Sequence, residues 1–538
     1  MRTFDVVVVG SGCSGAIAAQ ALVDAGKQVV MLDVGETNPA YQSLIPNKDF
    51  LTLRRTDPDQ YKYLIGEDAQ GIALHDSAKG AQITPSRGHM MRNVDTYTPL
   101  RSDTFAPIES LGYGGLGISW GLQCWEFTRK ELASVGMDAE RAIGAYETVA
   151  KHIGISGTWD AAGPYTLGEL ETYQPSPAMD RNMQRIYANY RKHQAYFDRS
   201  GVYLGRTPLA LITKGSKAGR KAYTYRDMDF YDDNGQSAWR PWVTVDALRK
   251  RQNFTYIGGF LATRFSEKGG ITTIHGIDTV TGKPSAYNCK RLILATGALG
   301  SARIALRSLG GGSNHKLPLL CNPYTYVPCV QPAMFGKAAE PRKIGFGQLS
   351  AFLGDEAEHD DTSILTLYSY QSLMLFRIIH QAPLNFSDAR SIMQYLSSGL
   401  IVTGVQHSDK STPNKYLQLH KKTGSVTGDE LRAAYVLSPE EIAGQRSRER
   451  RFIKAMRRSG LYAIKRMQPG HGSSVHYAGT LPFSNTDKSY HTDPSGRLYG
   501  TRGVYVADSS AFKFLPARGL TFTILANAQL TAENVLVS

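Results

Sequence analysis

The first 33 residues pair apolar runs with a glycine-rich turn. Residues 4–9 (Phe-Asp-Val-Val-Val-Val) form the apolar run of a buried strand, and residues 10–15 read Gly-Ser-Gly-Cys-Ser-Gly. Residues 16–25 then predict a helix that Gly26 ends, and residues 28–32 predict a second strand that ends at Asp33. The order of these elements predicts a β–α–β unit.

The glycine turn has the G-x-G-x-x-G spacing of a dinucleotide-binding site. Gly10 permits the tight turn, Gly12 lets the backbone approach a pyrophosphate, and Gly15 lets helix and strand pack closely. The helix N-terminus offers free N–H groups to the phosphates, and Asp33 is placed to accept a hydrogen bond from a ribose hydroxyl. An ordinary β–α–β turn is the alternative. We favour the dinucleotide site because strand, helix, second strand and acid all occur in the required order.

Similar patterns recur later in the chain. Helices are predicted at 139–153, 177–198 and 301–308, and strand-like runs at 242–266, 271–278 and 291–297. Residues 503–507 predict a strand before Asp508, and residues 520–537 predict a final helix. We therefore expect an α/β protein whose Rossmann-like nucleotide-binding domain comes from both chain ends and from middle pieces, namely residues 1–45, 100–130, 215–310 and 470–538.

Residues 311–440 differ in character and predict a second, sheet-containing α+β domain. They include a strand-like run at 363–370 and an apolar stretch at 373–402. Charged residues and Pro383 interrupt that stretch, so it cannot be a single membrane span. It is either a helix pair at a domain interface or a membrane-facing lip. We assign residues 46–99, 131–214 and 311–469 to this substrate-binding domain and cap.

Length and charge narrow the functional classes. With 538 residues, of which 42% are apolar, the chain is long enough for two or three domains. Its formal net charge of +14 favours an anionic substrate, an acidic membrane face or simply solubility. Residues 446–466 predict a basic helix with a solvated face. Basic and aromatic residues do not interleave, so no nucleic-acid partner is expected.

The five cysteines are scattered and form no C-x-x-C pair, which argues against a disulfide framework and a zinc site. They favour a reducing compartment, and we expect a cytoplasmic protein. The apolar run after Arg2 is too short for a secretory signal, because the glycine turn follows at once. No uncharged apolar stretch is long enough for a transmembrane helix.

Five sequence blocks together resemble the glucose–methanol–choline (GMC) family of flavoprotein oxidoreductases, over roughly half the chain. The family usually has Glu where Asp33 stands. The blocks are the glycine turn with Asp33-Val34-Gly35, Gly114-Gly115 with Ser119-Trp120-Gly121, Ile293 to Arg303, His476 to Thr480, and Val504 to Asp508 with Leu515-Pro516-Ala517.

The resemblance implies an FAD enzyme that oxidises a hydroxyl-bearing carbon to a carbonyl. A base must take the hydroxyl proton, and a histidine suits this because its unperturbed pKa is about 6.5. His476 lies in the matching motif, with His471 as the weaker alternative. No metal is expected. The expected cofactor-binding residues are Gly10, Gly12, Ser14, Gly15, Asp33, Gly114, Gly115, Ser119, Trp120, Ala295, Gly297, Asp508 and Thr521.

Two positions depart from the family pattern. Gly519 stands where the family has an Asn or His near the substrate hydroxyl, so Arg518, Thr521, another domain or a water would have to supply that contact. Ser119 stands where the related pyranose oxidases tether flavin through a His. We therefore expect non-covalent FAD, with Cys124 as the alternative tether.

The sequence thus predicts an FAD-dependent oxidoreductase acting on a CH–OH group of a sugar-like or glycosidic substrate. A non-oxidising lyase or decarboxylase on the same fold is the alternative, as is a steroid or alkyl alcohol oxidase. A binding protein that retains FAD structurally is a third class, against which His476 argues. The electron acceptor (oxygen, a quinone or a protein), a peripheral membrane contact and the oligomeric state stay open.

Overall fold

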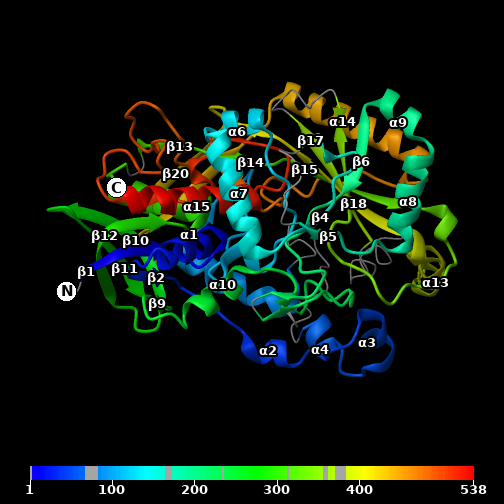
Figure 1. The fold of residues 1–538 in the computed structure, drawn as a ribbon, viewed down its shortest axis with the longest axis horizontal. Coiled ribbons are helices and arrows are strands. Elements are labelled where there is room, and N and C mark those ends of the chain that lie inside the picture. Colours follow the sequence, from blue (N-terminus) through cyan, green and yellow to red (C-terminus); the bar gives the residue numbers. More distant parts are fainter. Residues whose placement is uncertain are drawn as a thin grey trace.

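The computed structural model describes residues 3–66, 83–163, 173–217, 219–232, 236–311, 314–354, 362–369 and 383–538. Within these residues, a seven-stranded sheet and a six-stranded sheet form the two main layers. Figure 1 shows the seven-stranded sheet beside the N- and C-termini at the left, and the six-stranded sheet at the right. The mixed α/β character agrees with the expectation.

The opening β–α–β unit forms as its pattern predicts. Strand β1 (Thr3–Val9) pairs in parallel with β2 (Val29–Leu32), and helix α1 (Cys13–Asp24) connects them. The helix begins at Cys13, three residues before the predicted start, directly after the second glycine of the turn. Both strands bury their central residues, which explains the uninterrupted apolar runs.

The seven-stranded sheet brings together segments from both ends of the chain. Its order is β10-β11-β12-β1-β2-β9, and β24 pairs with β12. Strand β24 runs parallel to β12, with Ile293 opposite Tyr505. The remaining bounds are β9 (Phe254–Ile257), β10 (Phe260–Lys268), β11 (Ile271–Asp278), β12 (Pro284–Leu294) and β24 (Val504–Val506).

Helices pack against this sheet. Helix α15 (Thr521–Val537) contacts α1, and α7 (Ala139–Ile153) contacts α15. Helix α7 thus packs on a helix of the nucleotide-binding unit, although the sequence assigns residues 131–214 to the substrate-binding domain. Helix α11 (Gly297–Ser308) follows β12 directly and begins four residues earlier than predicted. The carboxyl ends of parallel strands are where nucleotide ligands bind in such sheets.

Two predicted elements were wrong in type or extent. Residues 242–248 form a helix, α10 (Pro241–Leu248), not a strand. The alternation Val243-Thr244-Val245 mimics a strand, but Pro241 occupies the first helical turn and α10 packs against α1. The single helix predicted at 177–198 is two helices, α8 (Arg181–Lys192) and α9 (Gln194–Ser200), separated at His193.

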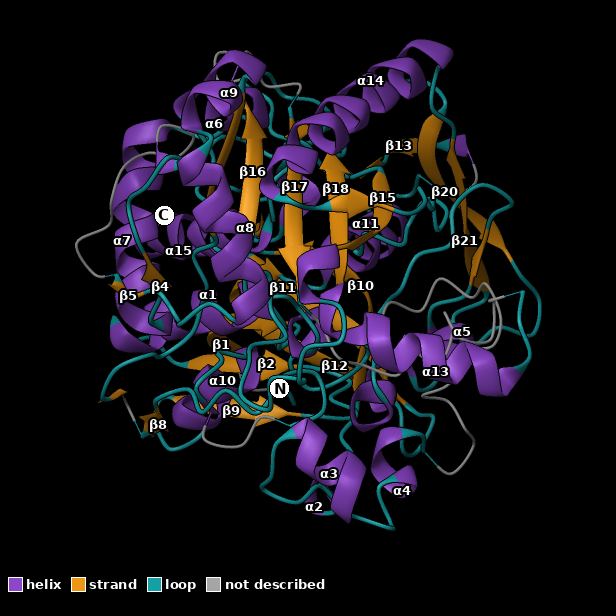
Figure 2. Ribbon diagram, turned by 90° about the vertical axis from the view of Figure 1, so that its right-hand side faces the viewer, coloured by secondary structure: helices purple, strands orange, loops and turns teal. Residues whose placement is uncertain are grey.

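The six-stranded sheet has the order β22-β15-β18-β17-β16-β6. One face packs on apolar residues of α8, α9 and α14 (Pro439–Met456). Figure 2 shows β15 to β18 side by side above β1, β2 and β12. The strands are β6 (Val202–Arg206), β15 (Tyr324–Val330), β16 (Leu349–Leu353), β17 (Ser363–Tyr368), β18 (Leu400–His407) and β22 (Tyr462–Ala463).

The apolar stretch 373–402 lies partly outside the described residues, which resume at 383. Its described part contains one helix, α13 (Phe386–Leu396), followed by the start of strand β18, so the helix pair is not observed there.

The basic run 446–466 is also not one helix. Helix α14 ends at Met456, a turn follows, and the chain then enters β22. None of the helices in the described part of the chain combines the length and apolar character that a bilayer crossing requires.

Smaller elements complete the described fold. A four-stranded sheet has the order β13-β20-β21-β3, and two-stranded pairs join β14 to β23, β19 to β25, β4 to β5 and β7 to β8. Their bounds are β3 (Leu100–Arg101), β4 (Ser156–Gly157), β5 (Gln174–Pro175), β7 (Ser216–Lys217), β8 (Arg220–Lys221), β13 (Lys316–Pro318), β14 (Leu320–Cys321), β19 (Asp409–Lys410), β20 (Lys415–Lys421), β21 (Asp429–Tyr435), β23 (Tyr477–Ala478) and β25 (Phe514–Leu515). The short helices are α2 (Pro39–Ser43), α3 (Phe50–Thr56), α4 (Tyr61–Leu64), α5 (Val94–Tyr97) and α6 (Arg129–Val135).

Candidate functional site

A cavity of about 320 Å³ is lined by residues from both large sheets. Its volume lies in the range of small-molecule sites. One part of its wall is the glycine turn after β1 and the end of β2, and another part is formed by β15, β17 and β18. The cavity therefore joins the predicted nucleotide site to the second sheet.

The three motif glycines have different roles in the turn. Gly10 has φ +102°, and a Cβ atom there would lie 2.5 Å from the Ala295 carbonyl oxygen. A Cβ atom at Gly15 would lie 1.9 Å from the Gly10 carbonyl oxygen, so this glycine is needed for packing within the protein. At Gly12 the nearest atom would be 3.9 Å away. Gly12 therefore leaves open space that the fold itself does not need.

The second glycine cluster faces the first. The Gly114 N–H donates to the Ser11 hydroxyl oxygen at 2.8 Å. A Cβ atom at Gly115 would lie 3.2 Å from the Cα atom of Gly12. The two glycine-rich turns thus approach closely, because Gly12 and Gly115 have no side chains where they meet.

Asp33 lies at the cavity wall as a partly buried carboxylate. It accepts hydrogen bonds from the Ser11 hydroxyl and, at 3.3 Å, from the Tyr256 hydroxyl. Burial raises the pKa of Asp33 to about 6, and the two hydroxyl donors oppose that rise. A carboxylate in this position can accept a hydrogen bond from a ribose hydroxyl.

The structure brings most of the predicted site residues to one cavity. Gly15 and Gly114 are not among the lining residues and act through packing and a backbone hydrogen bond. The buried carboxylate of Asp508 accepts from Ser301 at 2.7 Å, which ties β24 to α11. The predicted residues at the wall are Gly10, Gly12, Ser14, Asp33, Gly115, Ser119, Trp120, Ala295, Gly297, His476, Asp508 and Thr521.

His476 is positioned by the pairing of two short strands. Strand β14 pairs with β23 so that Cys321 lies opposite Tyr477, which places Asn322 beside His476. The His476 Nδ1 atom lies 2.9 Å from Asn322 Oδ1. Burial lowers the pKa of His476 to about 4, so the imidazole is neutral near pH 7.

The amide of Asn322 decides which nitrogen of His476 carries the proton. Its Nδ2 donates to the carbonyl oxygens of His407, at 2.8 Å, and Pro516, at 3.0 Å. The Oδ1 atom must therefore accept, and His476 Nδ1 must donate to it. The Nε2 atom then keeps its lone pair, as a base needs. Sequence reasoning missed Asn322, because it is 154 residues from His476 and no motif marks it.

The other histidines considered do not share this position. His471 is absent from the cavity wall and contacts the Tyr435 ring, with centroids 4.8 Å apart. His491 lies on the loop before Pro494, and its Nδ1 is 2.9 Å from the Ser489 carbonyl oxygen.

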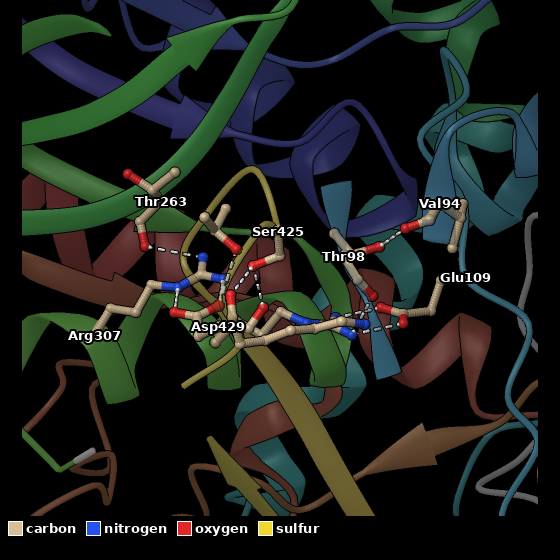
Figure 3. A network of polar contacts seen from close by, with 10 residues as sticks. Val94, Thr98, Glu109, Thr263, Arg307, Ser425 and Asp429 are labelled. Carbon is tan, nitrogen blue, oxygen red and sulfur yellow. Dashed lines mark hydrogen bonds and ion pairs between the residues drawn. The ribbon is translucent and has the colours of Figure 1, made fainter. Parts of the chain in front are cut away.

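Two arginines of α11 hold loops at another part of the cavity wall. Arg303 binds Glu109 through two nitrogens and donates to the Thr98 carbonyl oxygen at 2.9 Å. Arg307 binds both carboxylate oxygens of Asp429 at 2.6 and 2.8 Å. Figure 3 shows these contacts, with Arg307 and Asp429 on one side and Glu109 on the other. Nothing in the local sequence indicated these pairs.

The C-terminal part of the chain matches a known protein family. Residues 429–528 match the family profile described as GMC oxidoreductase. The C-terminal part of the chain therefore contains a GMC oxidoreductase domain. The resemblance found in the sequence is thereby confirmed.

Relatives of this oxidoreductase include two curated enzymes. Paromamine 6'-oxidase from Streptomyces fradiae is 24% identical over 324 residues, covering 58% of this chain and 50% of that protein. The alignment thus spans about half the length of this relative. The 6'''-hydroxyparomomycin C oxidase from Streptomyces lividus is 22% identical over 554 residues, covering 99% and 91% of the two chains.

Among solved structures, the oxidoreductase resembles pyridoxine 4-oxidase from Mesorbium loti. The two chains superpose with a TM-score of 0.57 at 13% identity, over 99% of each chain. At this identity the likeness concerns the fold alone.

The two departures from the family pattern are visible in the oxidoreductase. The Ser119 hydroxyl donates to Met90 Sδ at 3.3 Å, and Cys124 is fully buried and absent from the cavity wall. Gly519 lies at the wall, and a Cβ atom there would be 3.6 Å from the Gln123 Cβ, an ordinary contact. Its φ is not in the left-handed region, so the backbone does not require glycine.

Proposed function

We propose that this oxidoreductase binds FAD and oxidises a CH–OH group of a sugar-like substrate, with His476 as the base. The single observation that carries the proposal is His476 at the cavity wall with its tautomer set by Asn322. The names of the two curated relatives, both oxidases of sugar-like compounds, support the same substrate class.

The residues at the cavity fit FAD. Gly12 leaves a cradle at the N-terminus of α1, a helix of 12 residues whose N–H groups and dipole favour phosphate. Asp33 offers a carboxylate to the ribose. Ser119, Trp120 and His476 line the same cavity. When bound, FAD would supply the acceptor for the hydride from the carbinol carbon.

The chain's own part in the reaction is to orient the alcohol and take its proton. The His476 Nε2 lone pair accepts the hydroxyl proton, and the resulting imidazolium keeps its Nδ1 hydrogen bond to Asn322. Asn322 does not move with this transfer, because its amide is anchored to two backbone carbonyls. A neutral amide partner, unlike a carboxylate, leaves the pKa of His476 low, so the base is deprotonated before substrate arrives.

We further propose that FAD is held non-covalently. Ser119 is a poor tether, and burial raises the pKa of Cys124 well above its usual value, which suppresses the thiolate. Acid precipitation of the purified protein should release yellow FAD into the supernatant. Flavin that stays with the precipitated polypeptide would contradict this part of the proposal.

Anaerobic bleaching of the bound flavin tests the function, because it detects hydride transfer whatever the later acceptor. A panel of sugars, glycosides and alcohols should include compounds that bleach the wild-type protein. His476→Ala should retain FAD and lose about 10²–10⁴-fold in bleaching rate, the usual contribution of a positioned base. An unchanged rate in this variant would remove His476 from the role of base.

A non-oxidising lyase or decarboxylase on the same fold is the second candidate. Gly519 favours it, because this position contributes no side chain to the substrate. Such an enzyme would consume substrate without bleaching its flavin, so product analysis under anaerobic conditions separates the two candidates.

A further inference from the structure

One face of the six-stranded sheet forms an uncharged, tyrosine-rich wall of the cavity. Strand alternation places its side chains together, because Tyr324 lies opposite Gln406 and Tyr326 opposite Gly404, while Thr366 of β17 also pairs with Gly404. We call this face the tyrosine wall; it consists of Tyr324, Tyr326, Thr366, Tyr368, Gly404 and Gln406. Four of these residues, Tyr324, Tyr326, Tyr368 and Gln406, line the cavity.

The tyrosine wall adjoins His476. Tyr324 follows Asn322 by two residues, and Gln406 precedes His407, whose carbonyl oxygen accepts from Asn322. A molecule lying on this wall would share the cavity with the His476 imidazole.

Gly404 leaves room for the ring of Tyr324 because it has no side chain. A Cβ atom at Gly404 would lie 2.0 Å from the Tyr324 hydroxyl oxygen, so the ring crosses the strand above the glycine. The rings of Tyr324 and Tyr326 meet edge to face, with centroids 4.5 Å apart. The wall is thus a preformed aromatic surface, and its shape depends on a position without a side chain.

The hydroxyl of Tyr368 is held by neighbouring polar side chains at the cavity wall. Gln123 Nε2 donates to it at 2.8 Å, which occupies one of its acceptor sites. The side chain of Thr366 also hydrogen-bonds to it. Gln123 also lies beside Gly519, so the Gln123–Tyr368 pair stands next to the space that the glycine leaves open.

Charge is absent from this wall. The charged residues among the described cavity lining are Asp33, Glu109, Arg303, Arg307 and Asp508, and all of them lie outside β15, β17 and β18. A cationic ring would therefore find no carboxylate on the wall, and the net charge of +14 would slow its approach. An anionic ring would find no basic residue on the wall.

We propose that the tyrosine wall binds a neutral, polyhydroxylated ring, such as a monosaccharide or a cyclitol, in preference to charged or purely apolar rings. Tyrosine faces pack on the C–H surface of such a ring, and Tyr368, Gln123 and Gln406 exchange hydrogen bonds with its hydroxyls. The inference rests on the proposed function and names its substrate class.

Binding and bleaching are measured separately on the FAD-loaded enzyme. Dissociation constants come from the rapid shift in the flavin spectrum that precedes bleaching under anaerobic conditions. The probes are neutral monosaccharides and cyclitols, methyl glucosaminide as the cation, methyl glucuronide as the anion, and cyclohexylmethanol as the apolar ring. The neutral polyols should bind at least about 10-fold tighter than the other three classes, as expected when several hydrogen bonds differ.

Two variants locate the binding surface. Tyr368→Phe keeps the ring and removes the hydroxyl, and should weaken neutral polyols about 10-fold and cyclohexylmethanol much less. Gly404→Ala should weaken them by displacing the Tyr324 ring. The matched control is Tyr61→Phe, since Tyr61 is 51% exposed on α4 and should leave every constant unchanged.

The possible outcomes distinguish failure of the tyrosine-wall proposal from failure of the proposed oxidation. Neutral polyols that bind selectively and respond to Tyr368→Phe support the wall, and absent bleaching would then overturn only the proposed oxidation. Bleaching by charged or apolar rings with no effect of either variant would overturn the wall and leave oxidation standing. Failure of every neutral polyol to bind would also overturn the wall.

Discussion

The imidazole of His476 takes its orientation from an amide that is itself held by two backbone carbonyls. This arrangement separates two properties that a base needs. Burial keeps the pKa low, and the Asn322 oxygen presents the correct tautomer without adding charge. In the proposed reaction Asn322 is therefore a positioning residue, which would act through His476.

Replacing Asn322 tests this role. Asn322→Ala should retain FAD and reduce the bleaching rate by about 10–100-fold, as loss of an orienting partner does for ligating histidines. Asn253→Ala is the matched control, because the Asn253 amide also donates to two carbonyl oxygens, those of Val23 and Lys27, but has no histidine partner. Equal rate losses in both variants would indicate a general loss of stability rather than positioning.

The pH dependence of bleaching follows from the same histidine. With a pKa of about 4, His476 is neutral above that value and protonated below it. The bleaching rate should therefore stay level between pH 6 and 8 and fall as the pH drops through about 4, where the base is lost. Stopped-flow bleaching across this range checks it. A rate that declines already around pH 6.5 would mean that His476 titrates like an exposed histidine or is not the base.

At the scale of elements, two glycines of the first turn have different roles, one in folding and one in the proposed cofactor binding. A Cβ atom at Gly15 would clash with the Gly10 carbonyl oxygen, whereas a Cβ atom at Gly12 would have no neighbour closer than 3.9 Å. The same motif therefore contains one residue that the β1–α1 packing needs and one whose open space would accommodate the proposed FAD.

Two matched valine substitutions should show this division. Gly12→Val should fold with a near wild-type circular dichroism spectrum and fail to retain FAD, because its side chain fills the phosphate cradle. Gly15→Val should instead lower the yield of folded protein severely, since its Cβ cannot fit against Gly10. Full flavin content in Gly12→Val would remove this turn from the cofactor site.

At the scale of the whole molecule, the cavity is where distant segments meet. Its wall contains residues from the N-terminal turn, from α11, from the second sheet and from the start of α15. A ligand that fills it contacts all of these segments at once and stabilises the folded state by mass action.

Removing the cofactor should therefore lower the thermal stability of the whole chain. A ligand present at 1,000 times its Kd contributes about 4 kcal/mol to stability, which predicts a fall in Tm of several degrees for the FAD-free protein. Thermal scans with and without added FAD measure this shift, and Gly12→Val should show none. If added FAD does not change the Tm of the wild-type protein, the cofactor does not bind in this cavity.

The local sequence pattern was sufficient to predict the elements that depend only on neighbouring residues. The apolar runs of β1 and β2, the Gly10–Gly15 turn and Asp33 follow one another within a few residues, so spacing alone predicts their arrangement. The pattern failed at α10, where Val243 and Val245 suggest a strand. Packing on α1 decided for a helix there, and that contact involves residues more than 200 positions away.

The sequence by itself determined the α/β class, the glycine turn and the candidacy of His476, because each depends on neighbouring residues or on a short motif. Only the tertiary structure decided what surrounds them. Asn322 reaches His476 through the pairing of β14 with β23, and Gly404 meets Tyr324 through the pairing of β15 with β18. Contacts of this kind arise from chain segments that meet only after folding, and no local pattern of residues records which segments will meet.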